Sequence, residues 1–502
     1  MPIVATSFRP EQAIAALGSA IADAKGDDVL APVVVAVPSN TCGVMARRAL
    51  GREGGIAGVD MVTLDRLAEL IAGPSLAAAD RSPMSTPVVD LAVARVLSER
   101  PGSYAAVASH PSTVVALRDV HRELRRAGPE AAEAVAGQSH RGREAVRVSR
   151  AVTGALERRW YDEADLFTRA TEEVDAGGAS GLAHLVVYLP RDLRGLPLEF
   201  VSALGRRIDV RIVATAVGVD APDADVHDML DALDLPRSEV DAPRQVPGRL
   251  VSTTDADDEV RIATRLLLDA ARAGTPFERM AVLWPAQRPY ARLVEHHLGV
   301  AEIPWNGRPG TQTSERLAPR LVLDLLQVDR RGLRRRDLFA MLADLPARDA
   351  SGGFLPTARW ERVSREAGVA RDDDWQRRLG SLADSDTWGE SATALADFVS
   401  ELRTDLGHPA ATARWWDWAV WCEEQLDRWL GRSRLQGLAE PEYRAWETLT
   451  ASLDRLRHLD PVGEPVTRHR FRSTLEAELD DMPGRAGRVG DGVTVGPLAG
   501  AE

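Results

Sequence analysis

Lysine is almost absent from this sequence. Lys25 is the single lysine among 62 lysines and arginines in 502 residues. A phosphate-binding loop or a nuclease centre that needs a lysine can therefore use only Lys25, which is followed by Gly-Asp-Asp rather than by a helix start. The two cysteines, Cys42 and Cys422, are too few for a disulfide framework, a four-cysteine zinc site or a four-cysteine iron–sulfur cluster. This cysteine usage fits a reducing cytoplasm.

Several other signals are missing. No run of about 18 apolar residues exists, so we expect no membrane span, and the N-terminus lacks the basic and apolar segments of a signal peptide. Neither Gly-x-Ser-x-Gly nor His-Glu-x-x-His occurs. The neighbouring His296 and His297 would point about 100° apart on a helix and cannot hold one ion together. We therefore expect no cofactor and no metal in this chain.

The net charge of −13 argues weakly against a strong, sequence-independent grip on nucleic acid, although local patches remain compatible with it. Acidic residues gather at Asp220, Asp223, Asp225, Asp228, Asp231 and Asp234. Basic residues gather at Arg122, Arg125 and Arg126, at Arg141, Arg143, Arg147 and Arg150, and at Arg330, Arg331, Arg334, Arg335 and Arg336. The last group is either a phosphate-binding patch or a solvated helix face shared with Asp329 and Asp337.

Two regions alternate strands with helices, which predicts parallel sheets. The expected strands are residues 33–37, 61–64, 185–189, 210–214, 250–252, 280–284 and 492–498, with 33–37 and 280–284 buried. Expected helices include 11–24, one that runs through Leu50 with Ser39 to Thr41 as N-cap candidates, one from Asp65 that stops at Gly73, 196–207 and 290–298. Residues 255–259 should cap a further helix, whose apolar face would consist of Val260, Ala263, Leu266 and Leu267.

Helical stretches interrupt this alternation. Residues 75–180 are rich in alanine and charge, residues 330–485 are mainly helical, and residues 218–247 have the Asp/Pro composition of a linker. One stripe of residues steps by three and four positions, as on one face of a single helix: Trp415, Trp418, Cys422, Leu426 and Trp429. We expect this face to be buried in a core; the alternative is that its tryptophans stack on bases. Trp305 is a further candidate for stacking.

This layout resembles superfamily 1 helicases of the UvrD type, and more closely the AddB/RexB subunits of bacterial ATP-dependent helicase–nucleases and related PD-(D/E)XK nuclease family proteins of actinobacteria. VVVAVPSNTCGVMARRAL resembles motif Ia, and GVDMVTLDRLAELI resembles the strand and helix that follow it. DDEVRIATRLLLDAARAGTPFERMAVLWPAQRPYARLVEHHL resembles the second domain through motif IV, and DGVTVGPLAGAE resembles the approach to motif V.

The resemblance implies an α/β multidomain fold with two RecA-like parallel-sheet domains, each with an α-helical insertion. The expected parts are an inactivated first RecA-like domain at 1–75 plus 181–217, its helical insertion at 76–180, a linker at 218–247, an incomplete second RecA-like domain at 248–330 plus 486–502, and a helical insertion at 331–485.

Three positions depart from the family's ATPases. Their glycine-rich loop and lysine cradle phosphates, but the corresponding VATSFRPEQAIAAL has neither glycine nor lysine. The Walker B strand should end in Asp-Glu; here it runs into Tyr188, Leu189 and Pro190, with Asp192 displaced. The phosphate-contacting arginine of motif IV falls near Pro285. We therefore expect an inactive Walker A site and a degenerate ATPase.

The nuclease parts of the family are also missing from these residues. The AddB-like nuclease domain, with paired acidic residues and a lysine around a divalent metal, would lie beyond residue 502, as would the cysteines of the iron–sulfur cluster. The resemblance therefore implies a chain truncated before its nuclease domain. Whether the protein is an enzyme stays open: these residues predict no active site, while the full-length protein would be a DNA nuclease.

The motif Ia-like loop and the next strand supply the candidate DNA-binding residues, which are Ser39, Asn40, Thr41, Arg47, Thr63 and Arg66. The first three would bind a DNA phosphate through hydroxyl, amide and helix N-terminus, or would only cap the helix. Thr63 and Arg66 would face the same strand.

The resulting hypothesis is an inactivated helicase-like region of an AddB-like, cytoplasmic protein of DNA double-strand break repair and recombination. It would hold single-stranded or duplex-end DNA and dock an AddA-like helicase–nuclease subunit, without contact to a membrane. Two alternatives stay open: a protein-interaction scaffold that touches no DNA, and the N-terminal part of a PD-(D/E)XK DNA exonuclease.

Overall fold

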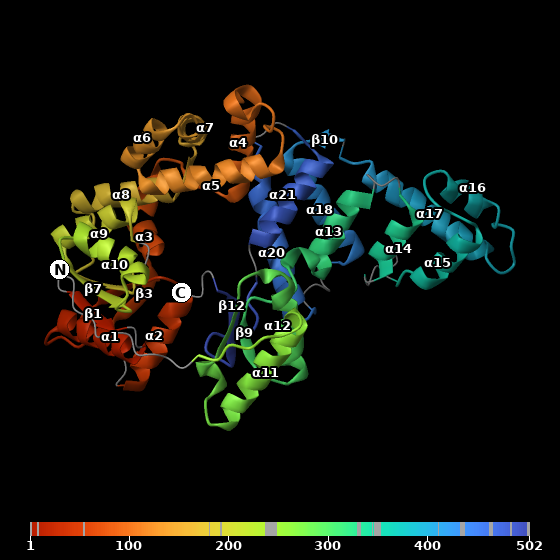
Figure 1. The fold of residues 1–502 in the computed structure, drawn as a ribbon. Coiled ribbons are helices and arrows are strands. Elements are labelled where there is room, and N and C mark those ends of the chain that lie inside the picture. Colours follow the sequence, from red (N-terminus) through yellow and green to blue (C-terminus); the bar gives the residue numbers. More distant parts are fainter. Residues whose placement is uncertain are drawn as a thin grey trace. The chain divides into compact units, whose positions relative to one another are not determined.

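The computed structural model describes most of the chain in two compact units (Figure 1). The described residues are 3–7, 10–53, 56–179, 181–190, 193–235, 248–328, 333–343, 345, 353–409, 411–431, 437–460, 465–481 and 484–498. Unit one comprises residues 1–85 and 89–252, and unit two comprises residues 253–501 with 86–88. The chain therefore has α/β architecture with parallel sheets in both units.

Unit one is built on a five-stranded, fully parallel sheet in the order β1-β7-β6-β2-β3. Its strands are β1 (Ile3–Ser7), β2 (Val33–Val37), β3 (Val59–Thr63), β6 (His184–Tyr188) and β7 (Asp209–Ala216). All four strands of this sheet that the sequence predicts are present. The sequence pattern missed β1.

Helices cover both faces of this sheet, because successive side chains of a strand point to opposite faces. In β6, Leu185 and Val187 face one core, and Val186 and Tyr188 face the other. The second core is covered by α1 (Pro10–Lys25) and α2 (Asn40–Glu53), and the first by α3 (Leu64–Ala78), α8 (Glu163–Asp175), α9 (Gly195–Arg207) and α10 (Asp220–Ala232). Figure 1 shows α1 and α2 in red on one side of the strands and α8 to α10 in yellow on the other.

Two expectations for unit one need correction. Helix α3 does not stop at Gly73 but continues through Pro74 to Ala78, because Ala72 and Leu76 are buried on the same face. The composition of residues 218–247 is that of a linker, yet residues 220–232 form α10. Its buried Val226 packs against the sheet, so an apolar stripe outweighs the acidic composition. Residues 236–247 of that segment lie outside the described residues.

Helices fill the stretch between α3 and β6, as the sequence predicts. They are α4 (Thr86–Glu99), the short η1 (Gly102–Tyr104), α5 (Pro111–Ala127), α6 (Pro129–Gln138), α7 (His140–Leu156) and α8, with a two-residue parallel pair of β4 (Ser82–Pro83) and β5 (Trp160–Tyr161). Helix α8 also joins the sheet core, where Phe167 lies 5.7 Å from Phe200 of α9 between ring centroids.

Unit two contains a smaller parallel sheet in the order β8-β12-β9. Its strands are β8 (Ala281–Trp284), β9 (Trp305–Gly307) and β12 (Val493–Pro497), and the two helices on its core are α11 (Ala256–Arg272) and α12 (Gln287–Val300). The helix cap at Asp255 is confirmed, because its carboxylate accepts a 2.9 Å hydrogen bond from the Asp258 amide. The predicted strand 492–498 is also confirmed as β12, which pairs with β8 and β9 although about 200 positions of the sequence separate them.

The structure corrects three details of unit two. Residues 250–252 form no strand. β8 is not a buried strand: it lies at the sheet edge, with Ala281 exposed and Leu283 exposed by 41%. The apolar face of α11 is narrower than expected, because Leu266 is exposed by 39% while Val260 and Leu267 are buried. An apolar run in the sequence does not reveal which of its side chains a partner layer will cover.

The rest of unit two is helical. Its elements are η2 (Phe277–Arg279), η3 (Thr313–Glu315), α13 (Leu317–Val328), α14 (Arg335–Ala343), α15 (Thr357–Glu366), α16 (Asp374–Gly380), α17 (Gly389–Leu406), α18 (Trp415–Trp429), α20 (Glu440–Arg457) and α21 (Arg468–Asp481), with the short pair β10 (Thr412–Ala413) and β11 (Val466–Thr467). No helix among the described residues has the length and apolarity needed to cross a membrane.

A buried polar network stabilises the helices of unit one. His121 of α5 is exposed by only 2%, and its Nδ1 lies 2.8 Å from the hydroxyl of Ser149 on α7. One turn further, Arg125 forms ion pairs with Asp162 and Asp165 at the start of α8, at 2.7 and 2.6 Å. Arg125 therefore holds helices together instead of adding to a basic surface patch.

Burial of His121 predicts a specific loss of stability in acid. Burial lowers the pKa of His121 from 6.5 to about 4. As the pH falls from 6.5 toward 4, His121 becomes protonated in the unfolded chain but stays neutral in the folded chain, so the free energy of unfolding decreases in that window. The loss is about 3 kcal/mol when the window has been crossed.

Urea unfolding followed by circular dichroism measures this effect. In His121→Gln the pH-dependent loss should disappear, so the stability difference between wild type and variant should shrink by about 3 kcal/mol across the window. The same pH dependence in both proteins would show that His121 is not the titrating group.

Candidate nucleic-acid interface

The carboxyl edge of the five-stranded sheet contains a topological switch point. The chain leaves β2 toward β3 on one side and leaves β6 toward β7 on the other, while β2 and β6 are neighbours. In open α/β sheets, ligands bind in the crevice outside the carboxyl ends of the strands at such a point. The turn from β2 into α2 lies there, and it contains Ser39, Asn40 and Thr41.

Ser39 caps helix α2. Its hydroxyl accepts a hydrogen bond of 3.2 Å from the Cys42 amide, and its carbonyl accepts the Gly43 amide at 3.0 Å. Asn40 is exposed. The first turn of α2 contains no acidic residue, so no carboxylate of its own neutralises the positive end of the helix dipole. The capping interpretation of Ser39 is therefore correct, and the same geometry presents a helix N-terminus to solvent.

Close packing holds α2 against the sheet. A Cβ at Gly43 would approach the side chains of Val37 and Met61 to 3.3 and 3.4 Å. These residues belong to the neighbouring strands β2 and β3, so the first turn of α2 lies directly over both strands. Glycine at this position allows the close approach, and the helix start is thereby fixed relative to the carboxyl ends of both strands.

Thr63 also caps a helix start, one strand away, although the first turn of α3 contains an acid, Asp65. Parallel pairing sets Thr63 beside Val37, so the two helix starts lie at the same edge of the sheet. The Thr63 hydroxyl caps α3 by accepting the Arg66 amide at 3.3 Å. The Arg66 guanidinium forms a 2.5 Å pair with Glu69, and both side chains are about half exposed. Such an exposed pair contributes little free energy, so a phosphate can compete for Arg66.

Arg47 does not join this group. Its guanidinium donates a 3.3 Å hydrogen bond to the carbonyl of Val59, the first residue of β3. Val59 lies four residues before Thr63, which is about 13 Å along the strand toward its amino end. Five of the six candidate residues therefore come together at the carboxyl edge, and Arg47 points the other way.

Sequence reasoning missed a further basic residue at this edge. Arg126, at the end of α5, lies close enough to Asp65 for its charge to oppose the rise in the Asp65 pKa that burial causes. The start of α9 is equally close, because a Cβ at Gly195 would lie 2.6 Å from the Arg126 carbonyl. The sequence showed that Arg126 belongs to a basic cluster, but only folding sets it beside α3.

Lys25, the one lysine that could serve a phosphate-binding loop, lies far from the β1–α1 turn and is engaged elsewhere. Lys25 ends α1, about 24 Å along that helix from the β1–α1 turn. Its ammonium donates three hydrogen bonds, to the carbonyls of Val29 (2.7 Å), Ala31 (3.0 Å) and Ala57 (2.6 Å). An ammonium has three donors, so Lys25 is fully engaged in joining the loops that precede β2 and β3.

Uncharged residues follow β6, where a Walker B motif would place Asp-Glu. Leu189 has a positive φ of 52°, its amide donates to Val213, and Pro190 comes next. Burial raises the pKa of Tyr188 and also that of the nearby Cys42 thiol, which keeps both groups neutral. Asp192 lies outside the described residues.

After β7, a carboxylate of the chain itself occupies a backbone anion site. Asp223 is exposed by 4% and accepts hydrogen bonds from the amides of Val217 and Gly218 at 2.8 Å and of Val219 at 3.1 Å. Consecutive N–H groups of this kind form a nest that binds anions. Asp223 fills that nest, so these amides cannot hold a phosphate without displacing it.

Metal ligands and stacking tryptophans were the other candidates for a functional site. The described part of the chain has no group of three His, Cys, Asp or Glu residues that could hold a metal ion. Trp415, Trp418 and Trp429 are at most 3% exposed, so the core interpretation of that stripe is confirmed and base stacking by it is excluded. Trp305 is partly buried against the core of the second sheet.

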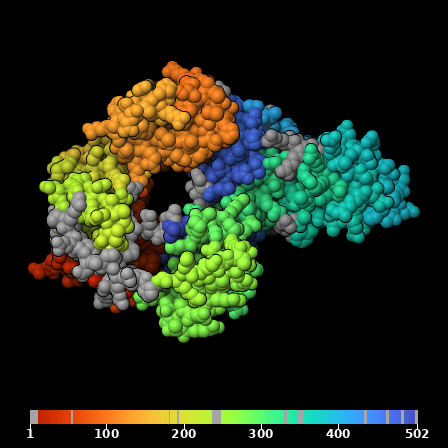
Figure 2. Space-filling view, in the orientation of Figure 1, coloured from red at the N-terminus to blue at the C-terminus, as the bar shows by residue number. Residues whose placement is uncertain are grey.

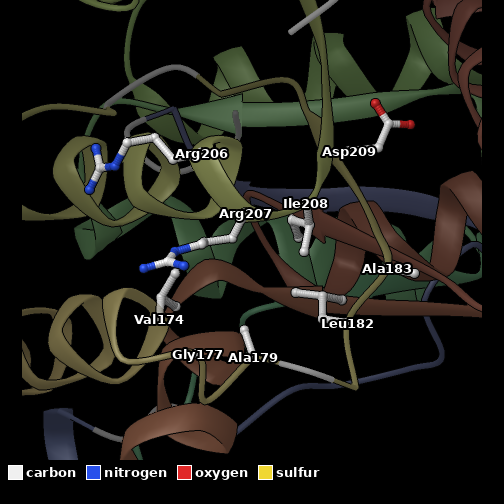
Figure 3. A pocket seen from close by; sticks show the side chains of 9 residues that line it. All are labelled: Val174, Gly177, Ala179, Leu182, Ala183, Arg206, Arg207, Ile208 and Asp209. Atoms are coloured by element: carbon white, nitrogen blue, oxygen red, sulfur yellow. The ribbon is translucent and has the colours of Figure 1, made fainter.

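A depression in the surface of unit one lies at the opposite edge of the sheet (Figure 3). It measures about 610 Å³ and lies next to Ala183, before β6, and Asp209, at the start of β7. In Figure 3 the side chains of Arg206 and Arg207 lie on the side away from Asp209. Both arginines bind Asp175, so this depression is separate from the carboxyl-edge residues.

Comparison with known proteins identifies no relative: no family model matches the chain, and no curated protein matches it either.

The three-way hydrogen bonding of Lys25 predicts that no other residue can replace it. Lys25→Met should lower the free energy of unfolding by about 1–2 kcal/mol, because three carbonyls lose their donor. Lys25→Arg should lose most of the same amount, because a planar guanidinium cannot direct three N–H groups to carbonyls that surround one point. Thermal unfolding by circular dichroism measures both changes.

Arg272→Met is the matched control, because Arg272 also lies in the last turn of a helix but forms only an exposed pair with Asp269. Its melting temperature should stay near that of wild type. Full stability of Lys25→Arg would show that the convergence of three carbonyls is unimportant.

Proposed function

We propose that this chain is the inactivated helicase-like region of an AddB-like protein of DNA double-strand break repair and recombination. In this proposal the two parallel sheets belong to two RecA-like domains that no longer hydrolyse ATP. The chain binds single-stranded DNA, or the strand at a duplex end, and docks an AddA-like helicase–nuclease subunit that supplies the motor.

One observation carries the proposal: two capped helix starts follow the neighbouring strands β2 and β3 at the carboxyl edge of the five-stranded sheet, and the one after β2 lies at the switch point. Two helix N-termini on neighbouring strands offer backbone N–H groups and hydroxyls to consecutive phosphates. Arg66 and Arg126 lie at the same edge in exposed pairs with Glu69 and Glu163, for which a phosphate can compete. The proposed contacts are to phosphates, and the six candidate residues include no aromatic side chain, so the affinity should fall with salt and depend little on base sequence.

The same edge is poorly suited to nucleotide hydrolysis. The single lysine is engaged elsewhere, the residues after β6 are Leu189 and Pro190, and Asp223 fills the anion nest after β7. Phosphate-loop chemistry needs a lysine and free backbone amides around the β- and γ-phosphates. We therefore propose that strand binding is independent of ATP.

Fluorescence anisotropy of a labelled single strand of about 20 nucleotides tests the proposal, because this length exceeds one typical binding site. Wild type should bind at low salt, more weakly at moderate salt, and equally with and without ATP and magnesium. Arg66→Ala should weaken binding several-fold and reduce the salt slope by about 0.7, because one phosphate contact is lost.

Arg47→Ala is the matched control, since it removes the same charge from a residue that points to the amino edge of the sheet. It should change the affinity by less than about twofold. Equal losses in both variants would mean that only overall charge matters. Absence of binding at low salt would overturn strand binding and favour the scaffold that docks a partner without touching DNA. Binding that requires ATP would overturn the inactive-ATPase assignment.

A further inference from the structure

A basic groove lies between two helices of unit two. Helices α14 and α15 enclose a space of about 320 Å³. It is lined by Arg335, Arg336, Phe339, Ala340 and Ala343 of α14 and by Glu361 and Arg365 of α15. These helices belong to the teal part of the surface in Figure 2. The lining contains three arginines and a single acid in a chain whose net charge is −13.

The arginines of the groove are incompletely neutralised. Glu361 pairs with Arg365, and Arg336 lies 3.5 Å from a carboxylate oxygen of Asp337 while remaining 83% exposed. Arg335 is half-buried and has no ion pair among the described residues. The groove therefore contains more guanidinium donors than carboxylate acceptors.

The position of these arginines in α14 increases the effect. Arg335 and Arg336 begin this helix and Arg334 precedes them, while the acidic Asp337 also belongs to the first turn. The N-terminal end of a helix carries partial positive charge, so cations at this end destabilise it. Asp337 offsets part of this charge and pairs with Arg336, which leaves Arg335 without an ion pair among the described residues. A phosphate bound at Arg335 would offset the remaining unfavourable charge at this helix end.

The apolar part of the groove lining favours such binding. Phe339 is exposed by only 6% and lines the groove together with the small Ala340 and Ala343. Charge-assisted hydrogen bonds are stronger beside apolar surface than in bulk water. Guanidinium groups match a phosphate with two parallel N–H donors each, which an ammonium cannot do.

A neighbouring arginine pair shows what a neutralised arrangement looks like. Arg377 and Arg378 of α16 both bind Asp374, at 2.8 and 2.9 Å. That carboxylate already supplies the acceptor that a phosphate would provide. The groove lacks an acid in the corresponding position for Arg335 among the described residues.

We propose that the groove between α14 and α15 is a phosphate-binding site. The phosphates belong either to a nucleic-acid strand or to a free polyphosphate compound, and the chemistry of the groove is the same for both. This inference does not depend on the proposed function, since the groove lies in unit two and shares no residue with the carboxyl edge of unit one.

Calorimetric titration of the full chain with inorganic tripolyphosphate tests the site, and anisotropy with a labelled single strand identifies the source. The double substitution Arg335→Ala/Arg336→Ala should weaken tripolyphosphate binding about tenfold or more, because two charge-assisted contacts are lost. Arg377→Ala/Arg378→Ala removes the same charge from the neutralised pair and should leave binding near wild type. Thermal unfolding checks that both variants remain folded.

The strand measurement separates the two sources. If the groove variant also weakens strand binding and lowers its salt slope by about 1.4, the ligand is a nucleic-acid strand. If only tripolyphosphate binding is lost, the ligand is a free polyphosphate compound. Tripolyphosphate binding by a wild type that fails to bind DNA would refute the proposed function and support the groove. Equal losses in both double variants, or no effect of the groove variant on either probe, would refute the groove.

Discussion

Parallel strands cannot be joined by tight turns, so each connection in the five-stranded sheet runs through a helix that returns across one face. This constraint brings all carboxyl ends to one edge and places the next helix start beside each of them. Because Val37 pairs with Thr63, the caps at Ser39 and Thr63 are neighbours although 24 positions separate them in the sequence. The proposed interface depends on this pairing, since a change in its register would separate the two helix starts.

Arginine has almost replaced lysine in this chain, and the structure gives a reason why Lys25 is the exception. A compact ammonium can donate to three carbonyls that surround one point, which Lys25 does between the loops before β2 and β3. The remaining bases are arginines, and many serve in ion pairs that connect helices, such as Arg125 with Asp162. Basic clusters in the sequence therefore overstate the basic surface. The groove at Arg335 differs because its arginines exceed the acids around them.

Local patterns predicted most elements of both sheets. The β-branched run 33–37 became β2 with the predicted limits, and the tryptophan spacing predicted a buried helix face correctly, because both signals reflect side-chain periodicity. The errors occurred where packing outweighs composition. Helix α3 continues through Gly73 and Pro74, and α10 forms in an acidic segment, because buried apolar side chains stabilise both helices.

The sequence by itself determined that Lys25 is the single lysine, that two α/β regions alternate with helical stretches, and that Ser39 can cap a helix. Only the tertiary structure decided which of these residues meet. It brought Arg66 and Arg126 to the carboxyl edge, turned Arg47 toward the amino edge, and filled the nest after β7 with Asp223. Spacing along one helix or strand is local information, whereas strand order and the direction of a long side chain depend on contacts between distant segments.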